Sequence, residues 1–367
     1  MKLAYIVNIN IGDKTARSVQ VEANSKSFYK SLGNDFKLHS VAHGNLPFAK
    51  SVYVFKQRIE KSRIRRVVFH SIVGFRMLFM DRNTVIYSRN LSVLAIATVL
   101  KFSVVWEIHD SISIINKRML NVVLKGSVSF IAISKALKDY LVDEFKIPAD
   151  LIEVAHDAVE MQNYDHWRET SKEALRNSVN LPLQKRIILH SGSLYRGRGM
   201  EVFRTILENF PDVILVQVGG TPEDIAKWKA HYSNINNIQF ISHVSNQELI
   251  KIQMSADICL LPMTTDNPIW WCTSPMKLFE YMATGNPIIS TNIGSISEVL
   301  DSSNSLVYDS EDSRTLVEAI NRLFHDIRLG DKISSNALID VRNQYTWDLR
   351  VNKILKHIQS TIGADNA

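Results

Sequence analysis

Short apolar runs alternate with longer amphipathic segments along most of the chain. The runs are apolar over most of their length, which is typical of strands that are covered on both faces. They span residues 3–9, 84–88, 103–109, 129–134, 186–192, 212–219, 237–242, 257–262 and 287–291. Helical patterns lie between them, at residues 91–101, 134–145, 199–209, 222–233, 245–255 and 275–284. Because strands and helices alternate, the sequence predicts an α/β protein with parallel sheets and right-handed crossovers.

This pattern starts again at residue 186, after a polar helical stretch. We therefore predict two Rossmann-like, doubly wound domains, with a boundary near residues 160–185. The first is assigned to residues 1–165 and the second to residues 166–345, and residues 346–367 read as a terminal helix. Two such domains side by side would leave a cleft at the carboxyl ends of their strands, where ligands of open α/β sheets bind.

Composition narrows the class of protein. The length of 367 residues fits two domains, and an apolar fraction of 46% with 22% charged residues is ordinary for a globular core. The two cysteines, Cys259 and Cys272, are too few for a disulfide framework or a zinc site, so a reducing compartment is expected. The amino terminus lacks the pattern of a leader, and no window is apolar for long enough to span a membrane. We therefore predict a cytoplasmic protein.

Positive charge is concentrated in the first half of the chain. Residues 1–165 hold 23 Lys and Arg against 15 Asp and Glu, a net charge of +8, whereas residues 166–367 hold 20 against 22, a net charge of −2. The densest basic stretch, residues 49–80, interleaves cations with Val, Ile and Phe. This stretch is either a solvated helix face or a helix that lies on an anionic membrane surface. Nucleic acid is disfavoured as a partner, because no binding motif accompanies the charge.

The stretch "TSPMKLFEYMATGNPIIS", residues 273–290, carries the most chemistry. Ser274 is expected to cap a helix whose first residue is Pro275, and Gly285 is expected to end it. The predicted polar face holds Lys277 and Glu280, and also Tyr281 and Thr284, opposite an apolar face that includes Leu278.

That helix follows the strand at 257–262, so its amino end should lie at the carboxyl edge of the sheet. Free amides there, with Lys277, would bind an anion such as a diphosphate. Glu280, about one turn deeper, would accept hydrogen bonds from a vicinal diol such as a ribose. The alternative is an ordinary surface helix with a Lys–Glu pair, worth a few tenths of a kcal/mol.

At this point the sequence resembles a known family. "SPMKLFEYMATGNPII" is similar to the C-terminal motif of family 4 glycosyltransferases, which are retaining enzymes of GT-B fold with nucleotide-sugar donors. Further resemblances occur in the family's order, in "YSRN" (87–90), "VWEIHD" (105–110), "FIAISKALKDYL" (130–141), "VAHDAVE" (154–160), "HSGSLYRGRGMEVF" (190–203), "IQFISHVSNQELIKIQMSADICLLP" (238–262) and "YTWDLR" (345–350). The resemblance implies that the terminal helix returns to the N-terminal domain.

The resemblance also implies a set of site residues. Its catalytic group is His109, Arg198, Lys277 and Glu280. The residues that it places around the donor are Gly192, Ser193, Arg196, Gly197, Gly219, His243, Val244, Ser274, Pro275, Met276 and Leu278. On the acceptor side it places Arg89 and Asp110, and His156 and Asp157 are expected either to line the cleft or to brace it.

Three positions depart from the family pattern. Cys272 stands where most members carry a first glutamate, so the contact to the sugar near its anomeric carbon is left open. Ser193 stands where an arginine is usual, and Arg198 stands where a lysine is usual. Trp270 and Trp271 read equally well as core residues or as a stacking surface.

The resemblance predicts transfer of a hexose-type sugar from a UDP- or GDP-sugar, with retention, to a glycan or lipid-linked acceptor in surface polysaccharide assembly. The chain contains no Asp-x-Asp pair, which favours a mechanism without a metal ion or cofactor. The alternatives are a non-catalytic nucleotide-sugar-binding partner, and another GT-B enzyme such as a sugar epimerase or a phosphorylase. A nucleotide-dependent oxidoreductase is disfavoured, because "NINIGDKTAR" and not G-x-G-x-x-G follows the first strand.

Overall fold

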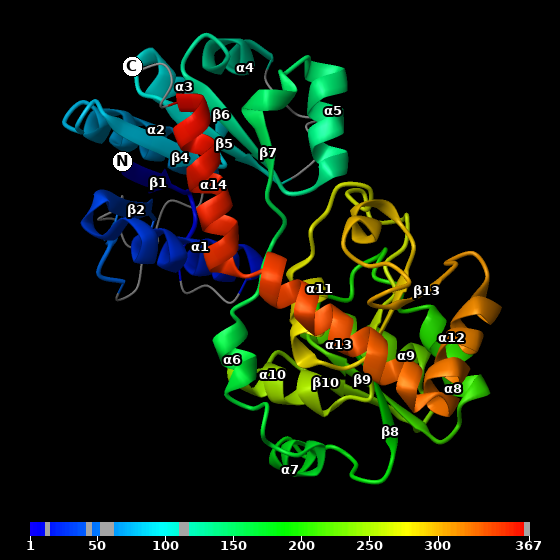
Figure 1. Ribbon diagram of the computed structural model, residues 1–367. Helices are drawn as coiled ribbons and strands as arrows, with labels where there is room; N and C mark the ends of the chain where they lie inside the picture. The colour runs from blue at the N-terminus through cyan, green and yellow to red at the C-terminus, as the bar shows by residue number, and fades with distance from the viewer. Residues whose placement is uncertain (12–14, 42–45, 52–61, 110–116, 363–367) are drawn as a thin grey trace. The chain divides into compact units, whose positions relative to one another are not determined.

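The computed structural model describes residues 1–11, 15–41, 46–51, 62–109 and 117–362. The chain divides into two compact units (Figure 1). Unit 1 consists of Met1–Asp157 together with Trp347–Ala367, and unit 2 of Ala158–Thr346. Residues 158–165, which the sequence analysis assigned to the first domain, therefore belong to unit 2.

Unit 1 is built on a parallel sheet of seven strands within its described residues, in the order β3-β2-β1-β4-β5-β6-β7. The strands are β1 (Lys2–Ile6), β2 (Phe36–Ser40), β3 (Ala49–Ser51), β4 (Thr84–Ser88), β5 (Val104–Ile108), β6 (Val128–Ala132) and β7 (Ile152–Val154). From β1 the chain builds outward to one edge, and from β4 it builds outward to the other. The winding direction therefore reverses between β1 and β4.

The helices of unit 1 are α1 (Ala16–Leu32), α2 (Ser62–Met77), α3 (Leu91–Val99), α4 (Lys117–Val123), α5 (Lys135–Phe145) and α14 (Trp347–Ile362). Helices α1 and α14 pack on one face of the sheet, where Phe28 of α1 and Ile354 of α14 join Tyr5 and Tyr87 in one hydrophobic core (Figure 1). The C-terminal helix α14 thus packs into the same hydrophobic core as the N-terminal helix α1.

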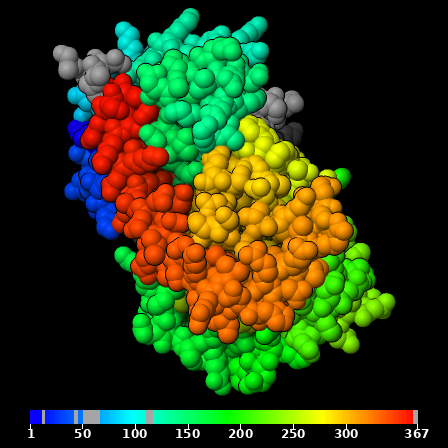
Figure 2. All heavy atoms as spheres, turned by 45° about the vertical axis from the view of Figure 1, so that its right-hand side comes forward, coloured from blue at the N-terminus to red at the C-terminus, as the bar shows by residue number. Residues whose placement is uncertain are grey.

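Unit 2 repeats the architecture with six parallel strands in its described residues, in the order β10-β9-β8-β11-β12-β13. The strands are β8 (Arg186–Ser191), β9 (Val213–Val218), β10 (Ile238–Ile241), β11 (Ile258–Leu261), β12 (Ile288–Thr291) and β13 (Leu306–Tyr308). The helices are α6 (Met161–Asp165), α7 (Lys172–Ser178), α8 (Val202–Asn209), α9 (Pro222–His231), α10 (Asn246–Ser255), α11 (Met276–Thr284), α12 (Ser313–His325) and α13 (Ile327–Gln344). Core clusters lie on both faces of the sheet, and the orange spheres of α12 and α13 lie at the surface of unit 2 in Figure 2.

The two parallel, doubly wound sheets confirm the predicted fold class. Helix α1 was not predicted, because its buried face is largely polar and carries Ser18, Gln20, Asn24, Ser25 and Ser27. Without apolar residues at helical spacing, the sequence gives no amphipathic signal there. The short strands β2, β3, β7 and β13 were also missed.

Helix α11 differs from its prediction in two respects. Its N-cap is Pro275 and its first residue is Met276, so Ser274 is not the cap. Tyr281 and Thr284, predicted on the polar face, are buried. The Tyr281 hydroxyl accepts a hydrogen bond from the backbone N–H of Ser191 over 2.7 Å, and this bond explains how a polar side chain is satisfied in the core. Gly285 ends the helix in the left-handed conformation, as predicted.

Candidate functional site

The central feature of unit 2 is the point where its winding direction reverses. Strand β8 is paired with β9 on one side and with β11 on the other. Gly192 follows β8 directly, and the loop after β11 leads into α11. Both segments therefore lie at the carboxyl edge of the sheet, between two strands from which the chain departs in opposite directions. Ligands of open α/β sheets bind at such a position.

Lys277, in the first turn of α11, reaches across this point. Its Nζ lies 2.8 Å from Nε2 of His190 and donates to the carbonyl oxygen of Ser191 over 3.0 Å. A Cβ atom added to Gly192 would lie 3.4 Å from the same Nζ. Within the described residues Lys277 forms no ion pair with a carboxylate. Burial, and then the nearby charge of Arg198, lower the pKa of Lys277 well below its usual value.

The two arginines of the loop after β8 are placed differently. The Arg198 guanidinium lies over the Tyr195 ring, 4.4 Å from its centroid, and hydrogen-bonds the Tyr195 hydroxyl. It is close enough to Lys277 to lower the pKa of that ammonium. Arg196 instead points to an exposed ion pair with Asp266 at 2.9 Å, and 82% of its side chain is exposed. Of the two arginines, therefore, Arg198 lies near Lys277, and Arg196 points to Asp266 instead.

Glu280 lies in a buried polar network one turn further along α11. Its Oε2 accepts a hydrogen bond from Gln253 Nε2 over 2.9 Å, and the Tyr164 hydroxyl donates to Gln253 Oε1 over 2.7 Å. Burial raises the pKa of Glu280, against the opposing effects of Gln253 and Lys277. The carboxyl is therefore fixed in position and able to accept further hydrogen bonds.

Glycines in the loops after β8 and β9 allow the backbones of these loops to approach each other closely. Gly192 has φ of +123° and Gly219 has φ of +97°, both in the region that favours glycine. A Cβ atom on Gly219 would lie 2.9 Å from the carbonyl oxygen of Gly192, so the ends of β8 and β9 touch through their backbones. Gly197 is buried against the backbone of Asn267.

The amino end of α11 has no side-chain cap among the described residues. Ser274 is buried, whereas Pro275 and Met276 are half-buried. Of the predicted contact residues, Leu278 has its side chain in the hydrophobic core, where 1% of it is exposed. Its side chain therefore holds the helix in place, and the helix amino end and Lys277 are the groups available to an anion.

The remaining predicted donor residues lie in or beside neighbouring loops. Ser193 and His243 are exposed, and Val244 packs partly against the core. Cys272 is fully buried, and Trp270 and Trp271 are half-buried. The backbone of Trp270 and Trp271 lies against Gly294.

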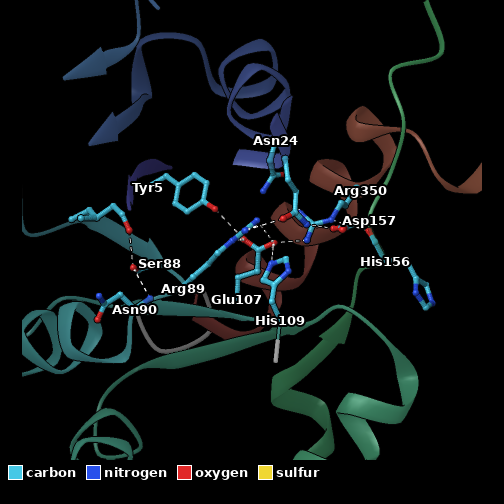
Figure 3. A network of polar contacts seen from close by, with 12 residues as sticks. Tyr5, Asn24, Ser88, Arg89, Asn90, Glu107, His109, His156, Asp157 and Arg350 are labelled. Atoms are coloured by element: carbon cyan, nitrogen blue, oxygen red, sulfur yellow. Dashed lines mark hydrogen bonds and ion pairs between the residues drawn. The ribbon is translucent and has the colours of Figure 1, made fainter. Parts of the chain in front are cut away.

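In unit 1 the corresponding position holds a buried charge network (Figure 3). Its centre is Glu107 in β5, which no solvent reaches. The carboxylate accepts hydrogen bonds from Arg350 Nη2 of α14 at 2.5 Å and from Arg89 Nε, just after β4, at 3.3 Å. His109 Nε2 lies 2.9 Å from Glu107 Oε1, and the Tyr5 hydroxyl donates to Oε2 over 3.3 Å.

The charges of this network determine its protonation. Burial by itself raises the pKa of Glu107, but Arg89, Arg350 and His109 together hold that pKa well below its usual value. Burial and then Arg89 lower the pKa of His109. The network therefore consists of an ionised carboxylate between two guanidinium groups, beside a neutral imidazole.

Two further predicted residues border the network, and one lies outside the described residues. Asp157 is buried and accepts a hydrogen bond from Gln20 Nε2, while Arg89 Nη1 donates to Gln20 Oε1 over 2.9 Å. The backbone carbonyl of His156 accepts from Arg350 Nε over 2.9 Å, so this segment braces α14. Asp110 belongs to residues 110–116, which are not described.

Sequence reasoning missed several residues that build both sites. In unit 1 these are Glu107, Arg350, Gln20 and Asn24, and in unit 2 they are His190, Gln217 and Gln253. A usable signal exists for three of them, because Glu107, His190 and Gln217 are polar residues inside largely apolar strand runs. A polar side chain in such a run must be satisfied by a specific partner.

The described residues contain neither a metal-binding cluster nor a helix that could span a membrane. No cluster of three or more His, Cys, Asp or Glu side chains there is arranged to hold a metal ion. Among the helices of the described segments, none combines the length and the apolar character needed to cross a bilayer.

Comparison with known proteins places these observations in context. Residues 171–339, within unit 2, match the family model described as "Glycosyl transferases group 1". The chain is also 23% identical over 231 residues to an uncharacterized glycosyltransferase of Methanocaldococcus jannaschii, an alignment that covers 60% of this chain and 57% of the relative. The match thus spans less than two thirds of that relative.

Solved structures match over nearly the whole chain. A glycosyltransferase from Rickettsia africae has a TM-score of 0.79 at 18% identity, with 98% of each chain covered. Anabaena HepE in complex with UDP has a TM-score of 0.74 at 15% identity, with 98% of this chain and 100% of that chain covered. Identities this low establish the fold alone, and that fold is GT-B.

Proposed function

We propose that this chain is a glycosyltransferase that moves a sugar, with retention of configuration, from a nucleoside diphosphate donor to an acceptor. One observation carries the proposal. Lys277 and Arg198 lie close together where the winding direction of unit 2 reverses, beside the uncapped amino end of α11, and neither forms an ion pair with a carboxylate among the described residues. Two such neighbouring cations repel each other, so an anion is their natural partner.

The chemistry of sugar transfer needs such a site. Negative charge grows on the β-phosphate of the donor as its bond to the sugar breaks. Cations and helix amides aimed at that group stabilise the transition state more than the ground state. In this proposal Lys277, Arg198 and the amides of Met276 and Lys277 carry that role, and they do so without a metal ion or cofactor. The absence of an Asp-x-Asp pair from the sequence fits this assignment.

The donor is proposed to be a UDP- or GDP-sugar. The match of residues 171–339 to the family model and the fold shared with HepE, whose structures include complexes with UDP and with UDP-glucose, support a donor of this class. Glu280, fixed by Gln253, is assigned to the hydroxyl groups of the donor. Unit 1 is assigned to the acceptor, with Arg89 at its site and Asp110 proposed there on sequence grounds. His109 is retained in the catalytic role that the family resemblance implies.

The acceptor is proposed to be lipid-linked, as in surface polysaccharide assembly, because unit 1 exposes an apolar patch with basic residues. Three side chains near the end of α2 are exposed, namely Phe75 at 63%, Leu78 at 51% and Phe79 at 76%. The rings of Phe75 and Phe79 are in edge contact, 5.1 Å apart. Arg76 lies between them in the sequence, and it lines a pocket together with Phe79, Lys37 and Lys50. Residues 52–61 of the predicted basic stretch are not described. Apolar side chains flanked by cations fit an anionic lipid surface.

Flotation of the full-length protein with vesicles tests this part of the proposal. Wild type is expected to float with vesicles that contain phosphatidylglycerol and not with neutral phosphatidylcholine vesicles. Phe75→Ser/Phe79→Ser should lose flotation. Ile327→Ser is the control, because Ile327 in unit 2 is also exposed, at 74%. Equal flotation of wild type and the double variant would refute the assignment of this patch.

A labelled-donor assay tests the function itself. The protein is incubated with UDP- or GDP-sugars carrying a radioactive sugar, with and without a lipid or glycan acceptor fraction, and all products are separated. Acceptor-dependent appearance of a labelled glycoside supports the proposal. Binding without turnover would favour a non-catalytic partner, an alternative supported by the departures from the family pattern at Ser193 and Cys272. Conversion of the free donor would favour an epimerase. A thermal-shift panel identifies which nucleotide binds.

A further inference from the structure

His190 occupies a position that the proposed chemistry does not yet use. It lies near the end of β8 and is completely buried. Its Nδ1 lies 2.5 Å from Oε1 of Gln217 in β9, and its Nε2 lies 2.8 Å from Nζ of Lys277 in α11. The imidazole therefore connects two strands of the sheet to the lysine at the candidate diphosphate site.

The side chains of Gln217, His190 and Lys277 form a series of hydrogen bonds. The contacts of Gln217 determine which atom is the donor in each of them. Gln217 Nε2 lies 3.1 Å from the carbonyl oxygens of both Gly192 and Val218, so this atom must be the amide donor. Oε1 of Gln217 is then an acceptor, and Nδ1 of His190 carries the proton. Nε2 is left with a lone pair, which accepts a hydrogen bond from the Lys277 ammonium group.

The charges around the ring agree with a neutral imidazole. Burial, and then Lys277, lower the pKa of His190 well below its usual value, and Arg198 acts in the same direction. The charged groups that face Lys277 are Arg198, from the loop after β8, and Glu280, from α11 itself. A protonated His190 would present a second N–H to Lys277 and would repel it.

Two of the three N–H groups of the Lys277 ammonium are directed to protein acceptors. One N–H is directed to His190 Nε2 and a second to the carbonyl oxygen of Ser191. An ammonium group has three N–H bonds, so one remains for a ligand. With two of them held by rigid partners, the direction of the third is fixed before any ligand binds.

We propose that His190, with its tautomer set by Gln217, is a positioning residue that aims Lys277 at the diphosphate of the donor. The inference rests on the function proposed above and adds to it residues that do not themselves touch the donor. The competing interpretation is that His190 only fills the core, where its ring packs against Phe203 at 5.9 Å between centroids. A phenylalanine could serve that packing role, but it could not accept a hydrogen bond from Lys277.

Binding of UDP or GDP, whichever binds wild type more tightly, separates the two interpretations. The dissociation constant is measured by calorimetry on full-length protein, well below each variant's melting temperature. His190→Phe keeps an aromatic ring beside Phe203 but removes the acceptor, and we expect roughly tenfold weaker binding, as for loss of a hydrogen bond to a charged group. His190→Gln places an amide oxygen near the former Nε2 and should recover part of that loss. Lys229→Met, on exposed α9, controls for a change of charge in unit 2.

A second measurement does not depend on the ligand. In protein labelled with ¹⁵N-histidine, His190 should show a protonated Nδ1 and an unprotonated Nε2, and the Nε2 resonance should shift in Lys277→Met. Loss of the Nδ1–H tautomer in Gln217→Leu would support the role of Gln217.

The outcomes are distinct. If wild type binds nucleotide and Lys277→Met weakens binding, but His190→Phe binds like wild type, the positioning role is wrong and the proposed function stands. A protonated Nε2 in wild type also overturns the inference. If His190→Gln and His190→Phe weaken binding equally, the hydrogen bond to Lys277 is not what His190 contributes. If neither UDP nor GDP binds wild type, the proposed function itself fails and this inference fails with it.

Discussion

Arg350 Nη2 lies 2.5 Å from Glu107 Oε1, and both side chains are almost completely buried. The contact joins α14, at the end of the chain, to β5 in the middle of the unit 1 sheet, 243 positions apart in the sequence. Arg350 also donates to Asn24 Oδ1 of α1 over 3.0 Å and to the carbonyl oxygen of His156 over 2.9 Å. A single guanidinium group thus connects three segments of unit 1 that are distant in sequence.

Arg350→Met is predicted to destabilise the protein strongly. Removal of one partner leaves the Glu107 carboxylate buried and short of a cation, which typically costs about 3–5 kcal/mol. Lys353→Met is the matched control on the same helix, because Lys353 forms an exposed ion pair with Glu153 at 3.0 Å, and such pairs contribute about 0–1 kcal/mol. Urea unfolding should show a large fall in the midpoint for Arg350→Met and a small one for Lys353→Met. Similar midpoints for the two variants would contradict the assigned importance of the buried pair.

Strands and helices whose buried residues are apolar could be predicted from the sequence. Elements whose buried residues are polar were much harder to predict. Strands such as β6 and β11 read as largely apolar runs because helices cover both of their faces. Helix α1 left no such signal, because its buried face carries Gln20 and Asn24, which serve the charge network rather than the hydrophobic core. Short edge strands such as β3 and β13 have too few residues to show a period.

The candidate site follows the same division. Lys277 and Glu280 were predicted because the helix that carries them has a clear start and end and resembles a family motif. The residues that hold them, His190 and Gln253, come from elements distant in the sequence. Their pairing depends on the strand order, which the sequence alone does not specify. The sequence shows His190 as a polar residue in a largely apolar strand run, but it does not show which residue His190 contacts.

Arg198 and Arg196 are predicted to differ sharply in their effect on nucleotide binding, although they are two residues apart. Arg198 lies close to Lys277, whereas Arg196 is in an exposed ion pair with Asp266. Arg198→Ala should weaken UDP or GDP binding by about 10–100-fold, because a charge-assisted bond to phosphate is lost. Arg196→Ala should change it by less than about threefold, as for an exposed charge. Calorimetric titration of both variants measures this, and the reverse order would mean that the loop rearranges when the donor binds.

Nucleotide binding is predicted to take up protons at Lys277. Burial and Arg198 lower the pKa of this ammonium in the free protein, and a bound diphosphate adds a nearby negative charge that raises it again. Above the pKa of the free protein, binding must therefore be accompanied by proton uptake, and affinity must fall as the pH rises. Titrations at a series of pH values, each in two buffers of different ionisation enthalpy, report the number of protons taken up. Lys277→Met should take up fewer protons than wild type, and equal uptake would exclude Lys277 as the group involved.

Acid is predicted to destabilise unit 1 through His39. Burial, and then Arg76, Lys50 and Lys37, lower the pKa of His39 to about 4. An unfolded chain has a histidine pKa of about 6.5, so the unfolded state binds more protons between these values. Stability from this residue is therefore complete above pH 6.5 and is lost as the pH falls toward 4. Between pH 7 and pH 5 the linkage relation gives a loss of about 2 kcal/mol.

His39→Asn isolates this contribution, because it removes the titrating ring. Its unfolding free energy should fall less between pH 7 and pH 5 than that of wild type, whatever its stability at pH 7. Part of the fall should remain, because burial also lowers the pKa of His156 to about 4. His325→Asn, on the exposed surface of α12, is the control and should lose as much as wild type. Chemical unfolding at the two pH values measures the difference, and an unchanged pH dependence in His39→Asn would show that His39 is not the group that acid protonates.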